Sequence, residues 1–401
     1  MRDEMKKVPR LRFRGFQEDW EQRKFKDIVD VRSGRDYKHL NEGNIPVYGT
    51  GGYMLSVDEA LSYSEDAIGI GRKGTINKPY LLQAPFWTVD TLFYSIPIEE
   101  NNLFFVNNLF QRINWKKYDE STGVPSLSKA VINKIAVKVP KIKEQSKIGD
   151  FFKQLDDTIA LHQRKLYQLK ELKKAYLKAM FVSMNTKNNK VPKLRFTDFE
   201  GDWEHRKLDD SIKVMDGDRG ANYPHDTDFF KDGDTLFLDT GNVTKNGFKF
   251  DSVKYITNEK DEQLRAGKLE KNDFVLTSRG TLGNVGFYDE VVYNLHPKIR
   301  INSAMLILRN TDEQLSYSYL HTLLKGQLIS DFMKKNQVGS AQPHITKSEF
   351  LKLNLNVPCN INEQNKIGNF FKSLDVTITL HQNKLEQLKD LKTSYLQNMF
   401  I

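Results

Sequence analysis

The sequence predicts an α+β protein in which two mixed α/β domains are separated by a long antiparallel two-helix coiled coil. Three observations lead to this fold class. Two segments of the 401-residue chain occur twice, the longer of them has helical periodicity, and the stretches between the repeats are rich in β-branched and aromatic residues. A chain of this length exceeds one ordinary core, so two or three domains are expected.

A short segment opens each half of the chain. Residues 8–27 read VPRLRFRGFQEDWEQRKFKD and residues 191–210 read VPKLRFTDFEGDWEHRKLDD, with identity at 12 of 20 positions. Each copy keeps its tryptophan, Trp20 and Trp203. Such agreement indicates an internal duplication.

The longer repeat predicts a helix. Residues 144–181 and 363–400 are identical at 26 of 38 positions. Apolar residues such as Ile148, Phe152 and Leu155 recur in steps of three and four, as on one side of a helix. The positions that differ between the copies follow the same steps, so the copies agree on the stripes that we expect to be buried. At ~1.5 Å per residue, such a helix spans roughly 57 Å.

A helix of this kind needs a partner, and the other copy is the obvious one. The residues predicted to pair the two helices are Leu155, Ile159, His162, Leu166, Leu169, Leu374, Ile378, His381, Leu385 and Leu388. Two histidines at one repeat position could bind a metal ion, but we favour a polar seam position that fixes helix register. No Cys/His cluster has zinc spacing, so no metal site is predicted.

The regions between the repeats, 28–138 and 211–356, predict mixed β structure. Strands are expected within 67–75, 86–96, 132–140, 234–240, 273–281, 285–294 and 304–310, and short helices at 103–113 and 315–335. Two short echoes link the regions: Lys-Gly-Thr at 73–75 resembles Arg-Gly-Thr at 279–281, and PSLSK at 125–129 resembles PHITK at 343–347. We therefore expect two copies of one α+β domain.

The predicted organisation has five parts. They are a first domain at 1–138, a first long helix at 139–183, an exposed linker at 184–190, a second domain at 191–356 and a second long helix at 357–401. The linker is assigned from its Asn/Lys composition.

Charge and cysteine content narrow the environment of the chain. Lys and Arg number 61 against 52 Asp and Glu, a net charge of +9 that favours an anionic partner without separating nucleic acid from anionic membrane. Cys359 is the single cysteine, so no disulfide can form within the chain. No secretory signal and no apolar run of membrane-spanning length are present, and we expect a cytoplasmic protein.

The sequence predicts no catalytic residues. GIGRKG at 69–74 matches G-x-G-x-x-G, but TINKPYLL follows it and resembles strand and turn, whereas a dinucleotide site needs a helix there. Glu171-Leu172-Lys173 resembles the end of a nuclease pattern but lies on the long helix without an acidic partner. No Walker A, G-x-S-x-G, H-E-x-x-H or adenine-methyltransferase DPPY motif occurs.

Basic and amide residues in loop-like settings are the remaining candidates for function. Arg pairs with guanine and Asn with adenine in the major groove of DNA, and Lys and Arg also hold phosphates. The candidate DNA-binding residues are Arg32, Arg35, Lys38, Arg72, Lys73, Arg219, Asn222, Asn242, Lys245, Arg279 and Arg300.

Together, the two repeated boxes and the segments DGDRGANYP and LTSRGTLGNVGFY resemble the specificity subunit of Type I restriction–modification enzymes, over residues 8–400. The resemblance implies that each variable region is a target-recognition domain and that the repeated helices pair. It implies double-stranded DNA, two methyltransferase (modification) subunits and restriction/translocase subunits as partners. The chain itself would bind no cofactor, and S-adenosylmethionine, ATP and Mg would belong to the partner subunits.

The predicted function is therefore that of a non-catalytic, sequence-specific DNA-binding subunit. Residues 28–138 would read one half of a bipartite, asymmetric site and residues 211–356 the other. The complex would carry out adenine-N6 methylation and ATP-dependent restriction through its partner subunits. Two alternatives stay open: a fused nuclease–methyltransferase, and a coiled-coil scaffold without DNA specificity.

Overall fold

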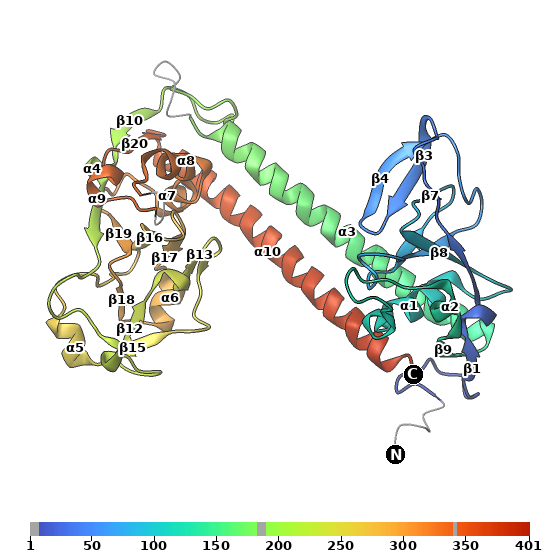
Figure 1. Ribbon diagram of the computed structural model, residues 1–401. Coiled ribbons are helices and arrows are strands. Elements are labelled where there is room, and N and C mark those ends of the chain that lie inside the picture. Colours follow the sequence, from blue (N-terminus) through green and yellow to red (C-terminus); the bar gives the residue numbers. More distant parts are fainter. Residues whose placement is uncertain (1–7, 183–189, 340–342) are drawn as a thin grey trace. The chain divides into compact units, whose positions relative to one another are not determined.

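The computed structural model describes residues 8–182, 190–339 and 343–401 (Figure 1). The chain forms two compact units: unit 1 comprises Met1–Lys165 and His381–Ile401, and unit 2 comprises Leu166–Leu380. Each unit contains one mixed α/β domain and one end of each long helix. The predicted linker at 184–190, apart from Lys190, lies outside the described residues.

Three small sheets form the domain of unit 1, called domain 1 below. A four-stranded antiparallel sheet has the order β2-β8-β5-β6, a three-stranded sheet has the order β4-β3-β7 with β3 and β7 parallel, and β1 pairs with β9. The strands are β1 (Glu21–Lys24), β2 (Val29–Ser33), β3 (Glu42–Gly49), β4 (Gly52–Val57), β5 (Ala67–Gly71), β6 (Tyr80–Leu82), β7 (Trp87–Thr88), β8 (Leu92–Pro97) and β9 (Ala136–Val139). The helices are α1 (Leu103–Arg112) and α2 (Lys129–Lys134), with 3-10 turns at Phe25–Asp27 and Trp115–Tyr118.

Domain 2, in unit 2, repeats this topology. Its sheets have the orders β11-β19-β16-β17 and β15-β12-β18, again with one parallel pair, β12 and β18, and β10 pairs with β20. It adds a two-stranded antiparallel sheet of β13 and β14. The strands are β10 (Glu204–Lys207), β11 (Ile212–Asp216), β12 (Thr235–Leu238), β13 (Val243–Thr244), β14 (Gly247–Phe248), β15 (Lys254–Ile256), β16 (Phe274–Thr277), β17 (Val285–Phe287), β18 (Ile299–Ile301), β19 (Met305–Asn310) and β20 (Asn354–Val357). The helices are α4 (Leu208–Ser211), α5 (Asn258–Gln263), α6 (Glu290–Leu295), α7 (Tyr317–Leu324), α8 (Gln327–Asn336) and α9 (Lys347–Phe350), with 3-10 turns at Asp226–Asp228 and Thr240–Asn242.

The prediction of two copies of one mixed domain is confirmed, but some predicted elements were wrong. The strand expected at 285–294 stops at Phe287, and α6 follows because the Asp289 side chain caps it by accepting from the Val292 amide at 3.0 Å. The segment 132–140 opens with the end of α2 before β9 begins. Capping by one short polar side chain overrides the β propensity of Val291 and Val292.

The repeated boxes dock each long helix onto its own domain. The first turn of helix α3 (Ile142–Met180) contains Glu144, whose buried carboxylate accepts two hydrogen bonds from Arg12 of the short box, both at 2.7 Å. Helix α10 (Ile361–Asn398) repeats the contact through Glu363 and Arg195 at 2.7 and 2.8 Å. A buried carboxylate is costly unless it is paired with a cation and hydrogen-bonded, and the arginine supplies both interactions in each copy.

The neighbouring glutamines tie the helix to the domain core. The Gln145 amide accepts from the Asn102 backbone at 3.2 Å and donates to the Pro140 carbonyl at 3.0 Å. Gln364 accepts from the Ser316 backbone at 2.8 Å and donates to the Pro358 carbonyl at 2.9 Å. The helix then crosses the domain so closely that a Cβ on Gly149 would lie 2.1 Å from Asn102 Oδ1.

Each domain also binds the end of the other long helix. Phe400, just beyond α10, stacks on Phe105 with ring centroids 5.3 Å apart and meets Trp20 edge-on. Phe181, just beyond α3, packs in the same way against Tyr319 and Trp203 in unit 2. The tryptophan that the two short boxes share thus holds the end of a repeated helix.

Within each unit the two long helices run antiparallel. In unit 1, residues 151 and 156 of α3 contact residues 395 and 392 of α10, so one number rises as the other falls. In unit 2, Tyr176 contacts Phe370 and Lys173 contacts Asp375.

Of the twelve α3 positions that differ between the repeats, ten are exposed. This agrees with the expectation that the copies differ on a stripe of the helix outside the buried seam. Within the described residues, no helix is long and apolar enough to cross a membrane.

Candidate DNA-reading surface

A surface hollow lies at the same topological place in each domain. It is found where the parallel strand pair ends: after β3 and β7 in domain 1, and after β12 and β18 in domain 2. The volumes are about 620 and 600 Å³. The chain reverses direction at this edge, so loop side chains converge there without belonging to the core.

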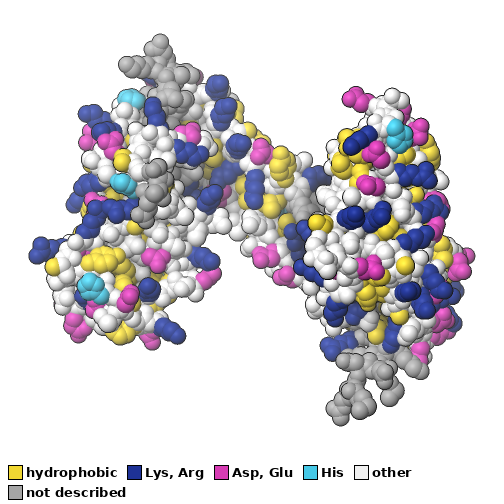
Figure 2. All heavy atoms as spheres, in the orientation of Figure 1, with side chains coloured by type: hydrophobic (Ala, Val, Ile, Leu, Met, Phe, Trp, Pro, Cys, Tyr) yellow, Lys and Arg dark blue, Asp and Glu magenta, His cyan; other side chains and the backbone are white. Residues whose placement is uncertain are grey.

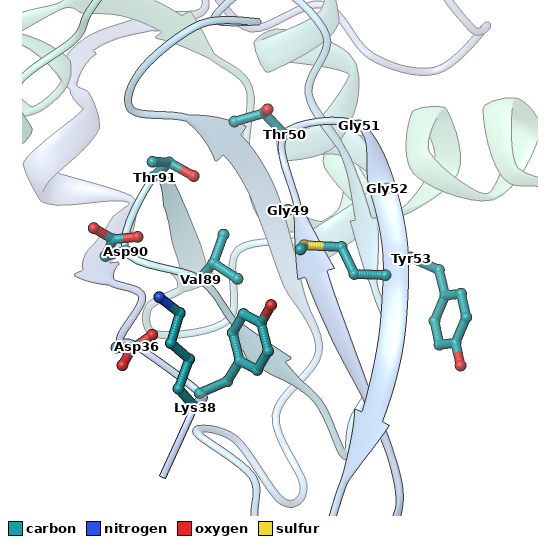
Figure 3. A pocket seen from close by; sticks show the side chains of 12 residues that line it. Asp36, Lys38, Gly49, Thr50, Gly51, Gly52, Tyr53, Val89, Asp90 and Thr91 are labelled. Atoms are coloured by element: carbon teal, nitrogen blue, oxygen red, sulfur yellow. The ribbon is translucent and has the colours of Figure 1, made fainter. Parts of the chain in front are cut away.

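Three loops line the hollow of domain 1. They are the segment before β3, the β3–β4 turn and the β7–β8 turn. Asp36, Lys38, Asp90 and Thr91 lie together on one side of the hollow, across Val89 from the Gly49–Tyr53 turn (Figure 3). The full lining is Asp36, Tyr37, Lys38, Gly49, Thr50, Gly51, Gly52, Tyr53, Met54, Val89, Asp90 and Thr91.

The hollow of domain 2 uses equivalent loops with different side chains. Its lining is Tyr223, Pro224, His225, Asp226, Thr227, Phe229, Phe237, Asp239, Lys254 and Asn302. Asp239 comes directly after β12, as Thr50 comes directly after β3. In the same way, Asn302 comes directly after β18 and Val89 directly after β7. The two hollows therefore share a backbone frame and differ in hydrogen-bonding groups.

Exposed carboxylates are the unexpected component of both hollows. Asp36 and Asp90 are exposed, and neither side chain makes a hydrogen bond or ion pair within the described residues. Carboxylates repel phosphate but accept hydrogen bonds from the amino groups of cytosine and adenine. Sequence reasoning missed these residues because it looked for cations and amides, and no sequence signal marked the strand ends at which they meet.

Six predicted candidates have exposed side chains. Lys38 lines the domain 1 hollow, and Arg35 precedes it with an exposed side chain. Lys245 is exposed at the β13–β14 turn. The Arg72 guanidinium lies 5.8 Å from the Phe93 ring, in a second hollow that Lys73 also lines. Arg279 is exposed in domain 2.

Three other candidates are exposed or half-buried but already engaged within the protein. Arg32 contacts Asp30 at 2.7 Å and Glu65 at 3.3 Å, and the hydrogen bond to Asp30 raises the pKa of its guanidinium. Arg219 pairs with Asp216 at 3.2 Å. The Asn222 amide donates to the Gln263 carbonyl at 3.3 Å.

Asn242 and Arg300 are corrections to the predicted set. Both are 5% exposed. The Asn242 amide accepts from the Asp239 backbone and donates to the carbonyls of residues 249 and 252, which closes a loop. Arg300 pairs with buried Asp261 and donates to the Ala266 carbonyl at 2.7 Å. Neither side chain can contact a ligand at the surface. The Arg300 guanidinium is buried in an ion pair, and the Asn242 amide already uses its oxygen and its NH₂ group in hydrogen bonds within the domain.

The predicted helix-pairing residues lie along the helix seam within each unit. Leu155, Ile159, Leu385 and Leu388 are buried, and Leu166, Leu169, Leu374 and Ile378 are half-buried. The His162 and His381 rings approach with Nδ1 atoms 3.1 Å apart, so one ring donates and the other accepts. Two equivalent ion pairs accompany them, Lys173–Asp375 at 2.5 Å and Lys392–Asp156 at 2.6 Å. No group of three or more metal-binding side chains occurs in the part of the chain that the structure describes.

Charge does not gather into one patch. Lysine and arginine side chains are spread over the visible face of each unit and are interspersed with acidic ones (Figure 2). DNA binding by such a surface depends on where loops place individual groups.

The family model for the Type I restriction modification DNA specificity domain matches residues 17–171 and 200–390. The chain belongs to this family. The two matched ranges each contain one domain and most of one long helix, as the duplication requires. The assignment confirms the predicted class of function, recognition of a DNA sequence, and gives no support to a scaffold without DNA specificity.

Two curated relatives of this specificity-domain protein come from Methanocaldococcus jannaschii. The Type I restriction enzyme MjaVIII specificity subunit is 22% identical over 332 residues, which cover 81% of this chain and 73% of the relative. The putative MjaX specificity subunit is 21% identical over 415 residues, covering 94% and 91%. Among solved structures, the S subunit of a Type I restriction-modification system from M. genitalium has a TM-score of 0.70 at 14% identity, with 98% of this chain and 99% of that chain covered. That likeness confirms the predicted fold.

Proposed function

We propose that this chain is the DNA-reading subunit of a Type I restriction–modification complex, and that each domain reads one half of a bipartite, asymmetric site. The pair of hollows supports this proposal most directly. They occupy one topological place but carry different hydrogen-bonding groups. A shared frame with different contact residues suits two different half-sequences.

In this proposal the hollows contact base edges in the major groove. Asp36 and Asp90 would accept from cytosine or adenine amino groups in one half-site, with Lys38 able to donate to guanine. In domain 2, Asn302 and Asp239 supply an amide and a carboxylate instead. Arg35 and Lys245 lie in loops of the same domains, as further candidates for base or phosphate contact.

The partners proposed are double-stranded DNA, two methyltransferase subunits and restriction/translocase subunits. S-adenosylmethionine, ATP and Mg would be bound by those partners. The long helices offer a feature that suits two copies of one partner. Leu161 and Leu380 occupy one repeat position and are 62% and 63% exposed, and Leu172 and Leu391 occupy another at 43% and 42%.

These leucines depart from the expectation that residues shared by the repeats are buried. Exposed apolar side chains cost solubility and mark interaction sites when they recur in a pattern. Because each unit carries one leucine of each kind, each unit would bind one methyltransferase subunit. Leu161→Ser with Leu391→Ser should then leave complexes with one bound methyltransferase subunit, measured as the mass of the assembly. Loss of both subunits, or of neither, would contradict this assignment.

Exchange of one reading domain tests the proposed function. Residues 211–356 are replaced by the corresponding region of a relative in a host that carries the complete system, and methylated adenines are mapped. One half of the methylated motif should change and the other should stay, because distant sites act independently. A change in both halves would refute the division of the site between the domains.

The proposed absence of catalysis has its own test. The purified chain is incubated with labelled S-adenosylmethionine and DNA, alone and with the methyltransferase subunits. Transfer of label should require the partner. Methyl transfer or DNA cleavage by the chain alone would contradict the proposal.

A further inference from the structure

The two sequence echoes meet in space in each domain. In domain 1, Lys73 and Ser126 form an antiparallel β-bridge, and the Leu127 amide donates to the Arg72 carbonyl at 2.9 Å. In domain 2, Arg279 and His344 form the equivalent bridge, and Ile345 donates to the Ser278 carbonyl at 3.0 Å. We call this feature the basic joint: residues 72–75 with 125–129 in domain 1, and residues 278–281 with 343–347 in domain 2.

The loop of each basic joint projects from the domain. Gly74 and Gly280 have φ of +85° and +71°, which other residues rarely adopt. A Cβ on either glycine would meet nothing within 4 Å, so the loop tip faces open space. The glycine therefore holds the preceding cation, Lys73 or Arg279, at an exposed turn.

Each basic joint carries cations without matching carboxylates. Lys73, Arg279 and Lys347 are exposed and form no ion pair within the described residues. Lys129 lies 4.0 Å from Asp30, which Arg32 already engages at 2.7 Å. The second cations, Lys129 and Lys347, each follow a hydroxyl residue that caps the next helix.

Carboxylates near the basic joint do not cancel this charge. In domain 1 the hollow of about 370 Å³ at the joint is lined by Arg72, Lys73 and Lys129 against one carboxylate, Glu120. The nearby Asp119 carboxylate accepts hydrogen bonds from the Ser121 and Ser126 amides at 3.0 and 2.9 Å. In domain 2, Glu349 is paired with Lys352 at 2.5 Å. A local excess of exposed, unpaired cations is destabilising through self-repulsion unless an anion binds.

The duplication indicates which anion. The hollows differ between the domains, as contacts to different half-sequences must, whereas the basic joint keeps its geometry and charge in both. A feature shared by two domains that read different sequences should contact what the two half-sites have in common. Every half-site presents the same sugar–phosphate backbone, and phosphate contacts position a protein without carrying sequence information.

We propose that the basic joint of each domain binds phosphate groups of the DNA backbone, through Lys73 and Lys129 in domain 1 and through Arg279 and Lys347 in domain 2. This assignment rests on the proposed function, because it requires each domain to lie on DNA. It separates these cations from the base-reading groups of the hollows.

The test uses the complex of the full chain with its methyltransferase subunits and a duplex that carries its methylated motif. The variants are Lys73→Gln, Arg279→Gln and the double variant. Lys117→Gln and Lys213→Gln are matched controls, because both lysines are exposed and Lys213 stands where β2 of domain 1 has Asp30. Affinity is measured against salt concentration on the motif, on single-base variants and on unrelated DNA.

Each lost phosphate contact should make the slope of log affinity against log salt shallower by about 0.9. The double variant should therefore lose about tenfold less affinity than the unsubstituted complex between ~50 and ~200 mM salt. All three DNAs should weaken by the same factor, the methylated motif should stay the same, and the controls should keep the original slope.

Other outcomes overturn the proposal. Altered preference at one base pair would make these residues base readers. Loss of methyltransferase subunits with an unchanged slope would make the basic joint a protein contact, and no change in slope or assembly would remove the site. An unsubstituted complex without preference for any bipartite sequence would instead refute the proposed function itself, whatever the variants do.

Discussion

At the scale of single residues, Arg32 and Arg35 are close in sequence but differ in what surrounds them. Arg32 is held by Asp30 and Glu65. Arg35 is exposed beside the domain 1 hollow and has no carboxylate partner within the described residues. A cation already paired within the protein gains little from DNA, because it must first give up its partner.

Arg35→Ala should therefore weaken DNA binding more than Arg32→Ala. If Arg35 reads a base, the loss should be roughly 1–3 kcal/mol and confined to one base pair of one half-site. Binding to a panel of single-base variants of the motif measures this. An equal effect of the two substitutions, spread over all sequences, would show that Arg35 contacts phosphate or nothing specific.

A second residue-scale prediction concerns pH. Burial lowers the pKa of His321 to about 4, and Lys325 and Lys173 add to the shift, while Asp375 and Asp289 oppose it. The ring packs against Phe274 and Phe287 in domain 2. Unfolded, the same histidine has a pKa near 6.5. Between pH 4 and pH 6.5, His321 is therefore protonated in the unfolded chain but neutral in folded unit 2.

The stability of unit 2 should consequently fall as pH drops from about 6.5 to about 4, and this loss should level off below. The contribution of His321 is about 3 kcal/mol over that interval. His321→Asn places the residue found at the equivalent position of domain 1, Asn107, and should flatten this part of the curve. Thermal unfolding of both proteins at several pH values is the measurement, and parallel curves would exclude His321 as the source.

The sequence shows which loop residues are polar or charged, but it does not show which of them are buried. Asn242 and Arg300 looked like surface contacts in the sequence, yet both close loops from inside the domain. Asp36 and Asp90 were not predicted to bind DNA, because carboxylates are unfavourable near phosphate. Whether a polar side chain faces outward depends on strand pairing across many residues, and no local pattern records that.

At the scale of elements, the long helices were predictable and the small sheets were predictable only in part. Apolar residues that recur with a period of about 3.6 over 38 residues indicate a helix strongly, and the pattern occurs in both copies of the repeat. Strands of two to four residues, such as β7 and β13, carry too little alternation to be recognised. The sequence predicted no strand order, and the two short similarities between the regions predicted only that both domains have the same α+β fold.

The docking of α3 on domain 1 makes an element-scale prediction. Alanine is favoured over glycine in a helix by about 1 kcal/mol. At Gly149, however, the new Cβ would lie 2.1 Å from Asn102 Oδ1, which caps α1 by accepting from the Phe105 amide. Gly149→Ala should therefore destabilise unit 1 by roughly 1–3 kcal/mol.

Gly123→Ala is the matched control, because its Cβ would meet nothing within 4 Å and its φ is not positive. That substitution should change stability by less than about 0.5 kcal/mol. Chemical denaturation compares the two variants with the parent chain. Stabilisation by Gly149→Ala would mean that the helix does not cross the domain at this distance.

At the scale of the whole molecule, the duplication gives one chain two equivalent halves joined by two continuous helices. Helices α3 and α10 contain 39 and 38 residues. The seam is nearly the same in both, and the His162–His381 pair marks one height at which the helices face each other. We propose that this helix pair sets the separation of the two half-sites on DNA.

Lengthening both helices at the same height tests this role. Because the helices are antiparallel, equivalent repeat positions away from the His162–His381 pair are not opposite each other, and the insertion points must be chosen from contacts across the seam. Duplicating residues 163–169 directly after His162, and residues 374–380 directly before His381, adds one heptad on the same side of the histidine pair in each helix. The seam then keeps its phase.

Seven added residues lengthen the pair by ~10.5 Å at ~1.5 Å each. Since DNA rises ~3.4 Å per base pair, the spacer of the methylated motif should grow by about three base pairs. Both half-sequences should stay the same, because neither domain is altered. Rotation around the duplex weakens binding in any case, so the methylated motif, rather than affinity, is the measurement. An active variant that methylates the original spacing would show that something other than these helices, such as the bound methyltransferase subunits, fixes the distance.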